Sequence, residues 1–471
     1  MKDLRDWIAV CEKEGELKRI TTEVDWNLEL SHVSVVNERK KGSPALLFEN
    51  VKGYDIPVLS SALTSYRRMA LTLGMPMHYS MCEMAREWMK ASARELIKPV
   101  QVKDGAVMER VVEGRNVNLY DFPAPQLYPL DGGRFIGTTA YLVTEDPDTG
   151  WTNLGLYRMQ ILDEKSTGIQ IIKGKHADFT MKKYERMGKK MPAAVVIGGD
   201  PILFLCACTA VPADTDEYDW AGALRGTPVE IMKSDLTGLK LPAHAEIILE
   251  GEIDPVNFRP EGPLGEYTGY YSGKVKLPQP WLNVKRVLRR KKPIFWMTTV
   301  AGRGEGGTNI VYSMQRTAGL WADLEAMRIP GIQSVYMIPQ AANRFWAVVS
   351  VKTMYPGHAN QVGNAVIATS TGHYGLKGVI VVDADIPADD LDGVWWSLGT
   401  RYDPFRDTDI IKRGRSTPLD PALPIDSRDI VSRIILDATT PYEWKDKPAL
   451  VKLDEGMEQH ILDRWPEYGL E

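Results

Sequence analysis

The central third of the chain alternates short apolar runs with turn signals, and this pattern restricts the fold more than any other feature. The turn signals include Asp-Pro-Asp-Thr-Gly at 146–150 and Gly-Gly-Asp-Pro at 198–201. The apolar or alternating runs lie at 135–144, 154–162, 168–172, 193–197, 202–208, 244–252, 281–287 and 293–300. Several short strands separated in this way predict a β-barrel or sandwich rather than a doubly wound parallel sheet.

The two flanking parts of the chain have a different pattern of apolar residues. Before residue 115, apolar runs at 45–48 and 56–59 and helical patterns at 65–73 and 81–96 predict a mixed α/β domain. After about 310, long helical segments alternate with buried strands, which predicts a second α/β domain. The charged segment 426–471 is expected to be a helical and irregular extension that packs on a partner subunit.

Composition excludes several classes of protein. The chain has 471 residues, 44% of them apolar, which is enough for two or three cores. A net charge of −5 provides no general attraction for nucleic acid, and four cysteines are too few for a disulfide scaffold. We expect no membrane segment and a cytoplasmic location. Cys206 and Cys208 would share one face if 202–208 is a strand, and we interpret them as small core residues.

Two glutamates flank a Gly-Pro-Leu-Gly segment, forming Glu261-Gly-Pro-Leu-Gly-Glu266. Proline and glycine prevent a continuous helix here, so the backbone turns and both carboxylates can face one space. Two carboxylates in one partly dry pocket do not share one pKa, and one of them tends to keep its proton. The pair is therefore a candidate for proton transfer, with a solvated turn as the alternative.

Four upstream residues have the chemistry of a site for a hard metal and a phosphate. They are Asn153, Arg158, His176 and Glu217. An amide oxygen, an imidazole and a carboxylate can hold Mg²⁺ or Mn²⁺ and leave positions open for phosphate. If 153–160 were one strand, Asn153 and Arg158 would face opposite sides unless Gly155 permits a bulge. Each residue taken alone is more often a turn, loop or surface residue.

A glycine-rich segment at 302–307 fits the dinucleotide pattern G-x-G-x-x-G after an apolar run, so an NAD site is a competing hypothesis. Two features disfavour it. Residues 308–312 are expected to separate the glycines from the next helix, and Asp323 and Glu325 fall inside that helix rather than after a second strand. A glycine loop over a pocket is the preferred interpretation.

Taken in order, these motifs resemble the UbiD-like family of prenylated-FMN-dependent decarboxylases, over most of the chain. The motifs are Asn153-x-x-x-x-Arg158, His176, Glu-Tyr-x-x-Ala-Gly-Ala-Leu-Arg-Gly at 217–226, Pro-Ala-x-Ala-Glu-Ile-Ile-Leu-Glu-Gly at 242–251, the 261–266 pair, Asp-Ala-Asp-Ile at 383–386 and Thr-Arg-Tyr-Asp-Pro at 400–404. Each motif is weak alone, and their order makes the combination specific.

The resemblance implies an N-terminal α/β domain at 1–115, a central split-β-barrel domain at 116–310 that binds flavin and metal, and a C-terminal α/β oligomerisation domain at 311–471 with a helical tail. It implies reversible non-oxidative decarboxylation of an aromatic, heteroaromatic or α,β-unsaturated acid through a covalent adduct with prenylated FMN, whose electron sink makes the C–C cleavage feasible. A separate UbiX-like prenyltransferase would supply the cofactor. The expected assembly is a homodimer or higher homo-oligomer.

The same resemblance assigns residues to roles. Arg158, Glu261 and Glu266 would be catalytic, with Glu266 as proton donor. Mn²⁺ (or Mg²⁺), beside K⁺, would link the cofactor phosphate to its protein ligands. The metal ligands would be Asn153, His176 and Glu217, and the cofactor-binding residues would be Asn153, Leu154, Gly155, Leu156, Tyr157, Arg158, Lys175, His176 and Glu217.

Some points stay open at this stage. A lysine that contacts the cofactor in some family members is absent at its usual spacing in the loop 368–377, which leaves Lys377 in doubt. Arg303 and His373 are candidates for reading a polar ring substituent or for surface positions. The acid used and the direction of reaction are undetermined. The rival functions are an NAD-dependent oxidoreductase built on 302–307 and a non-catalytic flavin-binding subunit.

Overall fold

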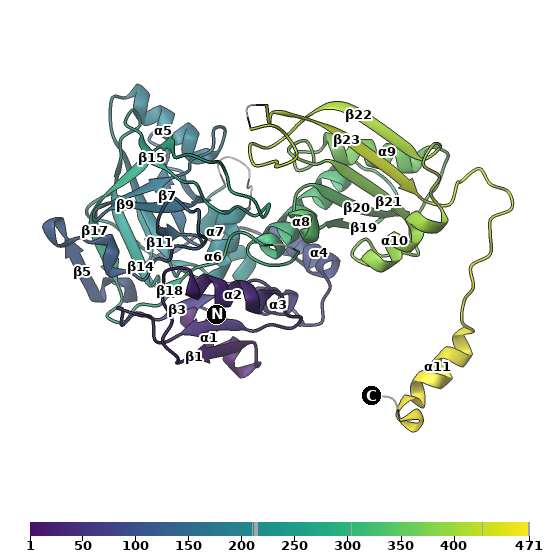
Figure 1. Ribbon diagram of the computed structural model, residues 1–471, viewed down its shortest axis with the longest axis horizontal. Helices are drawn as coiled ribbons and strands as arrows, with labels where there is room; N and C mark the ends of the chain where they lie inside the picture. The colour runs from purple at the N-terminus through teal and green to yellow at the C-terminus, as the bar shows by residue number, and fades with distance from the viewer. Residues whose placement is uncertain (210, 212–214, 303, 426, 470–471) are drawn as a thin grey trace.

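The computed structural model describes residues 1–209, 211, 215–302, 304–425 and 427–469. It has three domains, each built around its own sheet (Figure 1). The N-terminal domain lies at the lower centre of the view, the central domain at the left and the C-terminal domain at the right. The mixed α/β architecture agrees with the expectation from the sequence.

The N-terminal domain has four helices and a small sheet whose strand order is β1-β2-β3-β18. Its helices are α1 (Leu4–Lys13), α2 (Glu29–Glu38), α3 (Tyr66–Leu73) and α4 (Met81–Ser92). Its strands are β1 (Leu17–Ile20), β2 (Ala45–Phe48), β3 (Val58–Ser60) and, from later in the chain, β18 (Phe295–Trp296). Helix α4 starts at a capping box formed by Ser80 and Glu83, and such a box typically stabilises a helix start by about 1 kcal/mol.

The central domain is a largely antiparallel sheet in the order β6-β9-β10-β17-β14-β11-β7-β8, with β5 paired to β17. Its strands are β5 (Arg110–Glu113), β6 (Phe135–Gly137), β7 (Tyr141–Glu145), β8 (Thr152–Leu156), β9 (Met159–Asp163), β10 (Ser166–Ile169), β11 (Met191–Ile197), β14 (Ile247–Ile253) and β17 (Trp281–Arg289). There are two smaller sheets. One contains β4 (Val100–Gln101), β12 (Glu230–Lys233) and β13 (Lys240–Pro242), and the other contains β15 (Arg259–Glu261) and β16 (Leu277–Gln279). The helices of this domain are α5 (His176–Arg186), α6 (Pro201–Cys208) and α7 (Glu217–Arg225).

The strand expected at 202–208 is wrong, because these residues form helix α6. Asp200 caps the helix by accepting a hydrogen bond from the backbone N–H of Ile202, and Pro201 occupies the first turn, where it needs no hydrogen-bond donor. Helix α6 is buried between domains, and its residues are apolar on all sides. Its sequence therefore lacks the 3.6-residue hydrophobic periodicity that would distinguish a helix from a strand. Cys206 and Cys208 therefore do not share a face.

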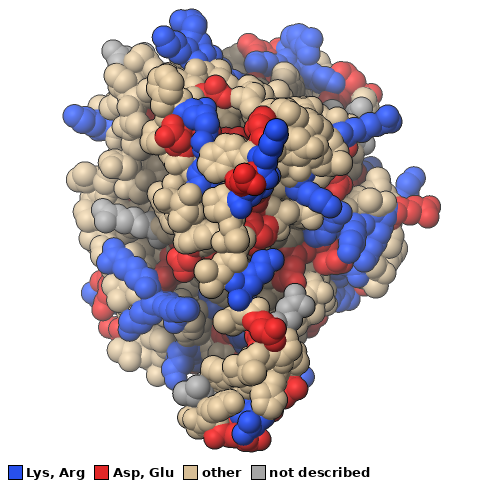
Figure 2. Space-filling view, turned by 90° about the vertical axis from the view of Figure 1, so that its right-hand side faces the viewer, with Lys and Arg blue, Asp and Glu red and all other residues tan. Residues whose placement is uncertain are grey.

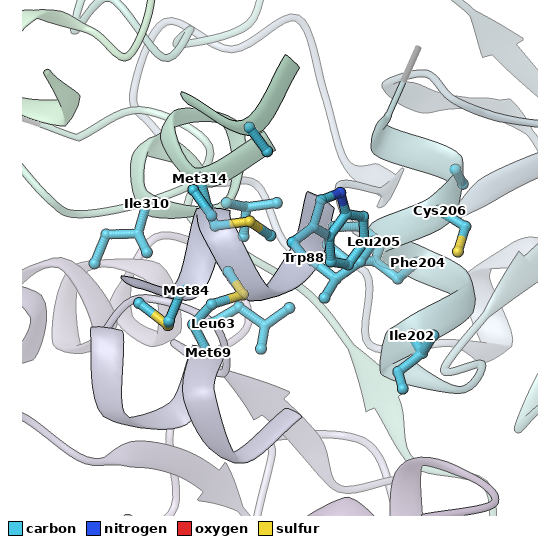
Figure 3. Packing of buried hydrophobic residues seen from close by; sticks show 14 of the residues in the cluster. Leu63, Met69, Met84, Trp88, Ile202, Phe204, Leu205, Cys206, Ile310 and Met314 are labelled. Carbon is cyan, nitrogen blue, oxygen red and sulfur yellow. The ribbon is translucent and has the colours of Figure 1, made fainter. Parts of the chain in front are cut away.

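A continuous apolar core joins the three domains. Figure 3 shows Met84 and Trp88 of α4 facing Ile310 and Met314 of α8, with Leu205 of α6 beside Trp88. Burying large side chains of this kind contributes about 1.5–3 kcal/mol each. The core therefore fixes α6 and α8 relative to the N-terminal helices.

The C-terminal domain is a five-stranded sheet in the order β19-β20-β21-β23-β22. Its elements are α8 (Asn309–Ala326), β19 (Ile332–Met337), β20 (Trp346–Val351), α9 (His358–Ala368), β21 (Gly378–Asp383), α10 (Leu391–Thr400), β22 (Thr408–Arg415), β23 (Ile430–Ala438) and α11 (Glu455–Asp463). The expectation of a helical and irregular extension from 426 is wrong at its start, because β23 pairs on both edges, with β21 and β22. Only the segment after Ala438 leaves the domain (Figure 1).

Among the described residues, no helix combines the length and the apolar character that crossing a membrane requires.

Candidate active site and cofactor site

Three of the predicted ligands meet where β8, α5 and α7 converge. The Asn153 amide nitrogen on β8 donates to the Glu217 carboxylate at 2.8 Å, and it lies 3.4 Å from Nδ1 of His176. His176 and Glu217 are the first residues of α5 and α7, so both helix starts point their side chains at one strand. The backbone N–H of Leu154 donates to the other Glu217 oxygen at 3.1 Å.

This cluster fits a divalent cation. Glu217 is 1% exposed, and burial raises the pKa of its carboxyl to about 8. A positive charge bound beside it would stabilise the ionised carboxylate. The Oδ1 atom of Asn153 is buried and has no hydrogen-bond partner in the described part of the chain. Burial and the charge of Lys175 lower the pKa of His176, which favours the neutral, ligating imidazole. No three His, Cys, Asp or Glu side chains of the described residues are grouped so that they could hold a metal, and this cluster has two such side chains beside the Asn153 amide.

Arg158 joins the two glutamates of the 261–266 segment. Its Nε and Nη2 atoms donate to the two oxygens of Glu261 at 3.1 and 2.9 Å, in a bidentate pair. Its Nη1 atom donates to Glu266. Arg158 lies between β8 and β9, which pair with different strands, so residues 153–160 do not form one strand. This break directs the side chain of Arg158 toward β15.

Small residues allow this close approach. Gly262 has φ +79°, and a Cβ there would lie 2.8 Å from Nη2 of Arg158. A Cβ at Gly168 would lie 2.9 Å from Cγ of Glu261. Glycine is required at both positions because a side chain would push apart the groups that must touch.

One guanidinium serves two carboxylates, and their environments differ. Glu261 takes the bidentate contact, while Glu266 makes a single contact and is 6% exposed. Burial raises the pKa of Glu266, and the nearby charge of Glu261 adds to this effect, while Arg158 opposes it. Glu266 thus holds a proton more readily than an exposed glutamate, which suits a proton donor.

Sequence reasoning missed the loop that holds the 261–266 segment in place. Asp131 accepts from the backbone N–H of Gly265 at 2.9 Å and from that of Tyr128 at 2.8 Å. The N–H of Gly132 donates to the Pro263 carbonyl at 2.8 Å. A Cβ at Gly132 would lie 1.8 Å from the carbonyl oxygen of Gly262, so only glycine fits. The Asp-Gly-Gly turn signal at 131–133 was the available clue.

The glycine segment 302–307 leads directly into α8, which begins at Asn309. The expected spacer at 308–312 is therefore wrong. The second objection to a dinucleotide site holds, because Asp323 and Glu325 lie within α8. The preceding strand is the two-residue β18, which pairs with the N-terminal sheet. Partly buried Glu38 of α2 accepts from the N–H of Gly307 and from the Thr299 hydroxyl, both at 2.9 Å, and so places a protein carboxylate against the loop.

The other candidate residues differ in where they lie relative to Asn153. Leu154, Gly155 and Leu156 form β8 beside Asn153, and Tyr157 is buried next to them. Lys377 is engaged elsewhere, since it pairs with Asp420 at 2.6 Å.

Lys175 is the N-cap residue of α5, directly before His176. Desolvation by surrounding protein atoms, followed by the charges of Arg344 and Arg316, lowers the pKa of Lys175 to about 8, although its side chain remains in contact with solvent. His373 is exposed, and its Nδ1 lies 2.7 Å from the carbonyl of Ser370. Arg303 lies outside the described residues.

Comparison with known families gives matches along nearly the whole chain. Residues 8–88, 98–304 and 309–438 match the N-terminal, Rift-related and C-terminal domains of 3-octaprenyl-4-hydroxybenzoate carboxy-lyase, the UbiD domains. An uncharacterised protein of Aquifex aeolicus is 34% identical over 495 aligned residues, which cover 100% of this chain and 99% of that protein.

Solved structures show the same arrangement. The vanillic acid decarboxylase of Sedimentibacter hydroxybenzoicus, in an open form, superposes with a TM-score of 0.88 at 30% identity, over 99% of this chain and 98% of that chain. The UbiD-class enzyme HmfF of Pelotomaculum thermopropionicum, in complex with FMN, has a TM-score of 0.88 at 28% identity, over 98% of this chain and 100% of that chain. An evolved dimeric form of HmfF was solved in complex with prenylated FMN.

Proposed function

The chain belongs to the UbiD-like family of carboxy-lyases, and from this premise we propose that it catalyses the reversible non-oxidative decarboxylation of an unsaturated carboxylic acid with prenylated FMN. The vanillic acid decarboxylase among its structural neighbours favours an aromatic acid, with heteroaromatic and other α,β-unsaturated acids as a wider class. The observation that carries the proposal is the buried guanidinium of Arg158, shared by Glu261 and Glu266. An NAD-dependent oxidoreductase is not favoured.

When bound, prenylated FMN supplies an electron sink for the electron pair left behind as CO₂ departs. The chain's own residues act around it. Arg158 binds the substrate carboxylate and holds Glu261 in place through the bidentate pair. Entry of the substrate carboxylate draws Arg158 away from its single contact with Glu266, which makes protonation of Glu266 easier. Glu266 then delivers its proton to the carbon that lost CO₂.

Asn153, His176 and Glu217 are proposed as ligands of Mn²⁺ or Mg²⁺, with K⁺ nearby, and the metal would hold the cofactor phosphate. The unpartnered amide oxygen of Asn153 and the raised pKa of Glu217 support this assignment. Lys175 would add positive charge next to the phosphate, and residues 154–157 would line the cofactor. We retain the division into 1–115, 116–310 and 311–471 as part of the proposal, although β4 and β5 join the central sheets from before residue 115 and β18 joins the N-terminal sheet from after residue 116. A cytoplasmic location and a UbiX-like prenyltransferase that supplies the cofactor are also part of the proposal.

We also propose a homo-oligomer assembled through the C-terminal domain and its tail. The tail runs away from the three domains and ends in α11, a nine-residue helix too short to be stable alone in water (Figure 1). Val451 and Leu453 on this tail are 102% and 72% exposed, and Phe405 on the C-terminal domain is 99% exposed. Figure 2 shows uncharged surface between scattered charges of both signs on this side of the molecule. Apolar side chains on a detached segment are best explained by burial against a second copy.

Substitution Glu266→Gln should lower kcat by about 10²- to 10⁴-fold, because the proton donor is lost while the flavin site is unchanged. Protein co-expressed with a prenyltransferase would be assayed for CO₂ release, with flavin content read from its absorbance. In the wild type, kcat should fall as pH rises through the raised pKa of Glu266, since the acid form is the active one. The exposed substitution Glu95→Gln is the control. Wild-type kcat in Glu266→Gln would remove Glu266 from the mechanism.

Substitutions His176→Ala and Glu217→Ala should each lower bound metal and bound flavin together, because one ion would connect the protein to the phosphate. Metal is measured by elemental analysis and flavin by absorbance, each per chain. Full metal content in both variants would contradict the assignment of these ligands.

Removal of residues 441–471 should reduce the subunit number, because it deletes the detached segment and leaves β23 and the C-terminal sheet intact. Light scattering on a sizing column gives the mass of each species. A full-length protein that is monomeric, or a truncated protein with an unchanged mass, would contradict a tail-mediated assembly.

A further inference from the structure

A strained turn lies where the chain passes from the N-terminal sheet to the C-terminal domain. It consists of Thr299, Val300 and Ala301, after β18 and before α8. Val300 has φ +54°, in the left-handed region, where a β-branched residue is a rare outlier. The N–H of Ala301 closes the turn by donating to the Thr299 carbonyl at 2.6 Å. Such strain persists only where surrounding contacts hold the backbone in place.

Two side chains from different domains hold this turn. On one side, Glu38 of α2 accepts from the Thr299 hydroxyl at 2.9 Å, and the Ser61 hydroxyl donates to the same carboxylate at 2.8 Å. On the other side, the Tyr128 hydroxyl lies 2.7 Å from both the Thr299 and the Ala301 carbonyls, so two acceptors share its one proton. Burial raises the pKa of Tyr128 well above its ordinary value, so the phenol remains a donor at neutral pH.

The ring of the same tyrosine packs against the segment that carries the proposed proton donor. A Cβ at Gly265 would lie 2.6 Å from Cδ2 of the Tyr128 ring. The φ of Gly265 is outside the left-handed region, so the ring requires glycine there and the backbone conformation does not. Gly265 immediately precedes Glu266. The position of the ring therefore sets the position of the backbone at Glu266.

Backbone contacts strengthen the connection between the tyrosine and the glutamate segment. Asp131 accepts from the N–H of Gly265 at 2.9 Å and from that of Tyr128 at 2.8 Å, so one carboxylate joins the two. The N–H of Leu130 donates to the Tyr271 hydroxyl at 3.1 Å, and Tyr271 forms a β-bridge with Gly265. Tyr128 thus contacts the strained turn through its hydroxyl and the glutamate segment through its ring.

We propose that Tyr128 is a positioning residue for Glu266, and that it holds this glutamate beside Arg158 only while the 299–301 turn keeps its strained conformation. This inference rests on the proposed function. The turn lies between β18 of the N-terminal sheet and α8 of the C-terminal domain, so a shift of either element reaches the proton donor through one phenol ring. The tyrosine itself transfers no proton, because its hydroxyl is engaged by two carbonyls.

The test removes the Tyr128 hydroxyl and keeps the ring. Holoenzyme co-expressed with a prenyltransferase is assayed for CO₂ release from the acid that reacts fastest in a panel of benzoates, furoates and cinnamates. Substitution Tyr128→Phe should lower kcat by about 10- to 100-fold, because a small displacement of a catalytic group is costly. KM, flavin content and metal content should stay as in the wild type. Tyr355→Phe is the matched control, since that hydroxyl donates to the Gln361 side chain at 2.7 Å within the C-terminal domain.

Relief of the strain should rescue the variant. Glycine adopts the left-handed region freely, so Val300→Gly alone should keep most of the wild-type kcat. Tyr128→Phe combined with Val300→Gly should then have a higher kcat than Tyr128→Phe alone. Losses that multiply in the double variant would overturn the proposal, because Tyr128 would not be acting through the turn.

A second measurement does not depend on turnover. Hydrogen–deuterium exchange in Tyr128→Phe should be about 2- to 10-fold faster at the amides of Gly265 and Ala301, because the contacts around both lose a hydrogen bond. Peptides from β20 are the reference. Wild-type kcat, unchanged exchange at Gly265, or a loss of kcat together with flavin would each overturn the positioning role. A wild type that releases no CO₂ from the panel would contradict the proposed function, and exchange alone would then decide whether the turn and the glutamate segment are coupled.

Discussion

The arrangement depends on one guanidinium shared by two buried carboxylates. Arg158 neutralises only one negative charge, and its bidentate contact is with Glu261. Glu266 is left with a single contact in a buried setting, and its pKa is raised. Two chemically identical side chains thus have different environments, and burial favours the protonated form of Glu266. That difference makes one glutamate an acid and leaves the other as a partner for the arginine.

Close backbone contacts hold this trio together. Gly262 and Gly168 permit the approach of Arg158 and Glu261, and Gly132 packs against the Gly262 carbonyl. Asp131 fixes the backbone of Gly265, one residue before Glu266. The site therefore relies on residues that do no chemistry themselves, and a single added methyl group at Gly132 would displace the acids by collision with the backbone.

The trio and the metal-type cluster were predicted through the resemblance that the motifs carry in their order, since spacing alone does not show that these residues converge. The turn at 261–266 was predictable from glycine and proline, and most of the helices and strands followed from periodicity. Helix α6 could not be recognised, since burial on every side removes the amphipathic signal that distinguishes a helix from a strand. Strand β23 was not recognised as a strand, because it lies in a segment rich in charged residues. Its pairing on both edges identifies it as part of the sheet. Asp131 and Glu38 act through contacts between distant segments, which spacing along one chain cannot reveal.

The most direct test of the central claim is the fate of hydrogen at the carbon that loses CO₂. Holoenzyme in D₂O should release CO₂ and place one deuterium at that carbon, because the acidic proton on Glu266 exchanges with solvent before transfer. Substitution Arg158→Ala should abolish both CO₂ release and deuterium incorporation while the flavin stays bound, as mass spectrometry of the product and absorbance of the protein would show. Near-normal CO₂ release from Arg158→Ala with full flavin content would contradict the account.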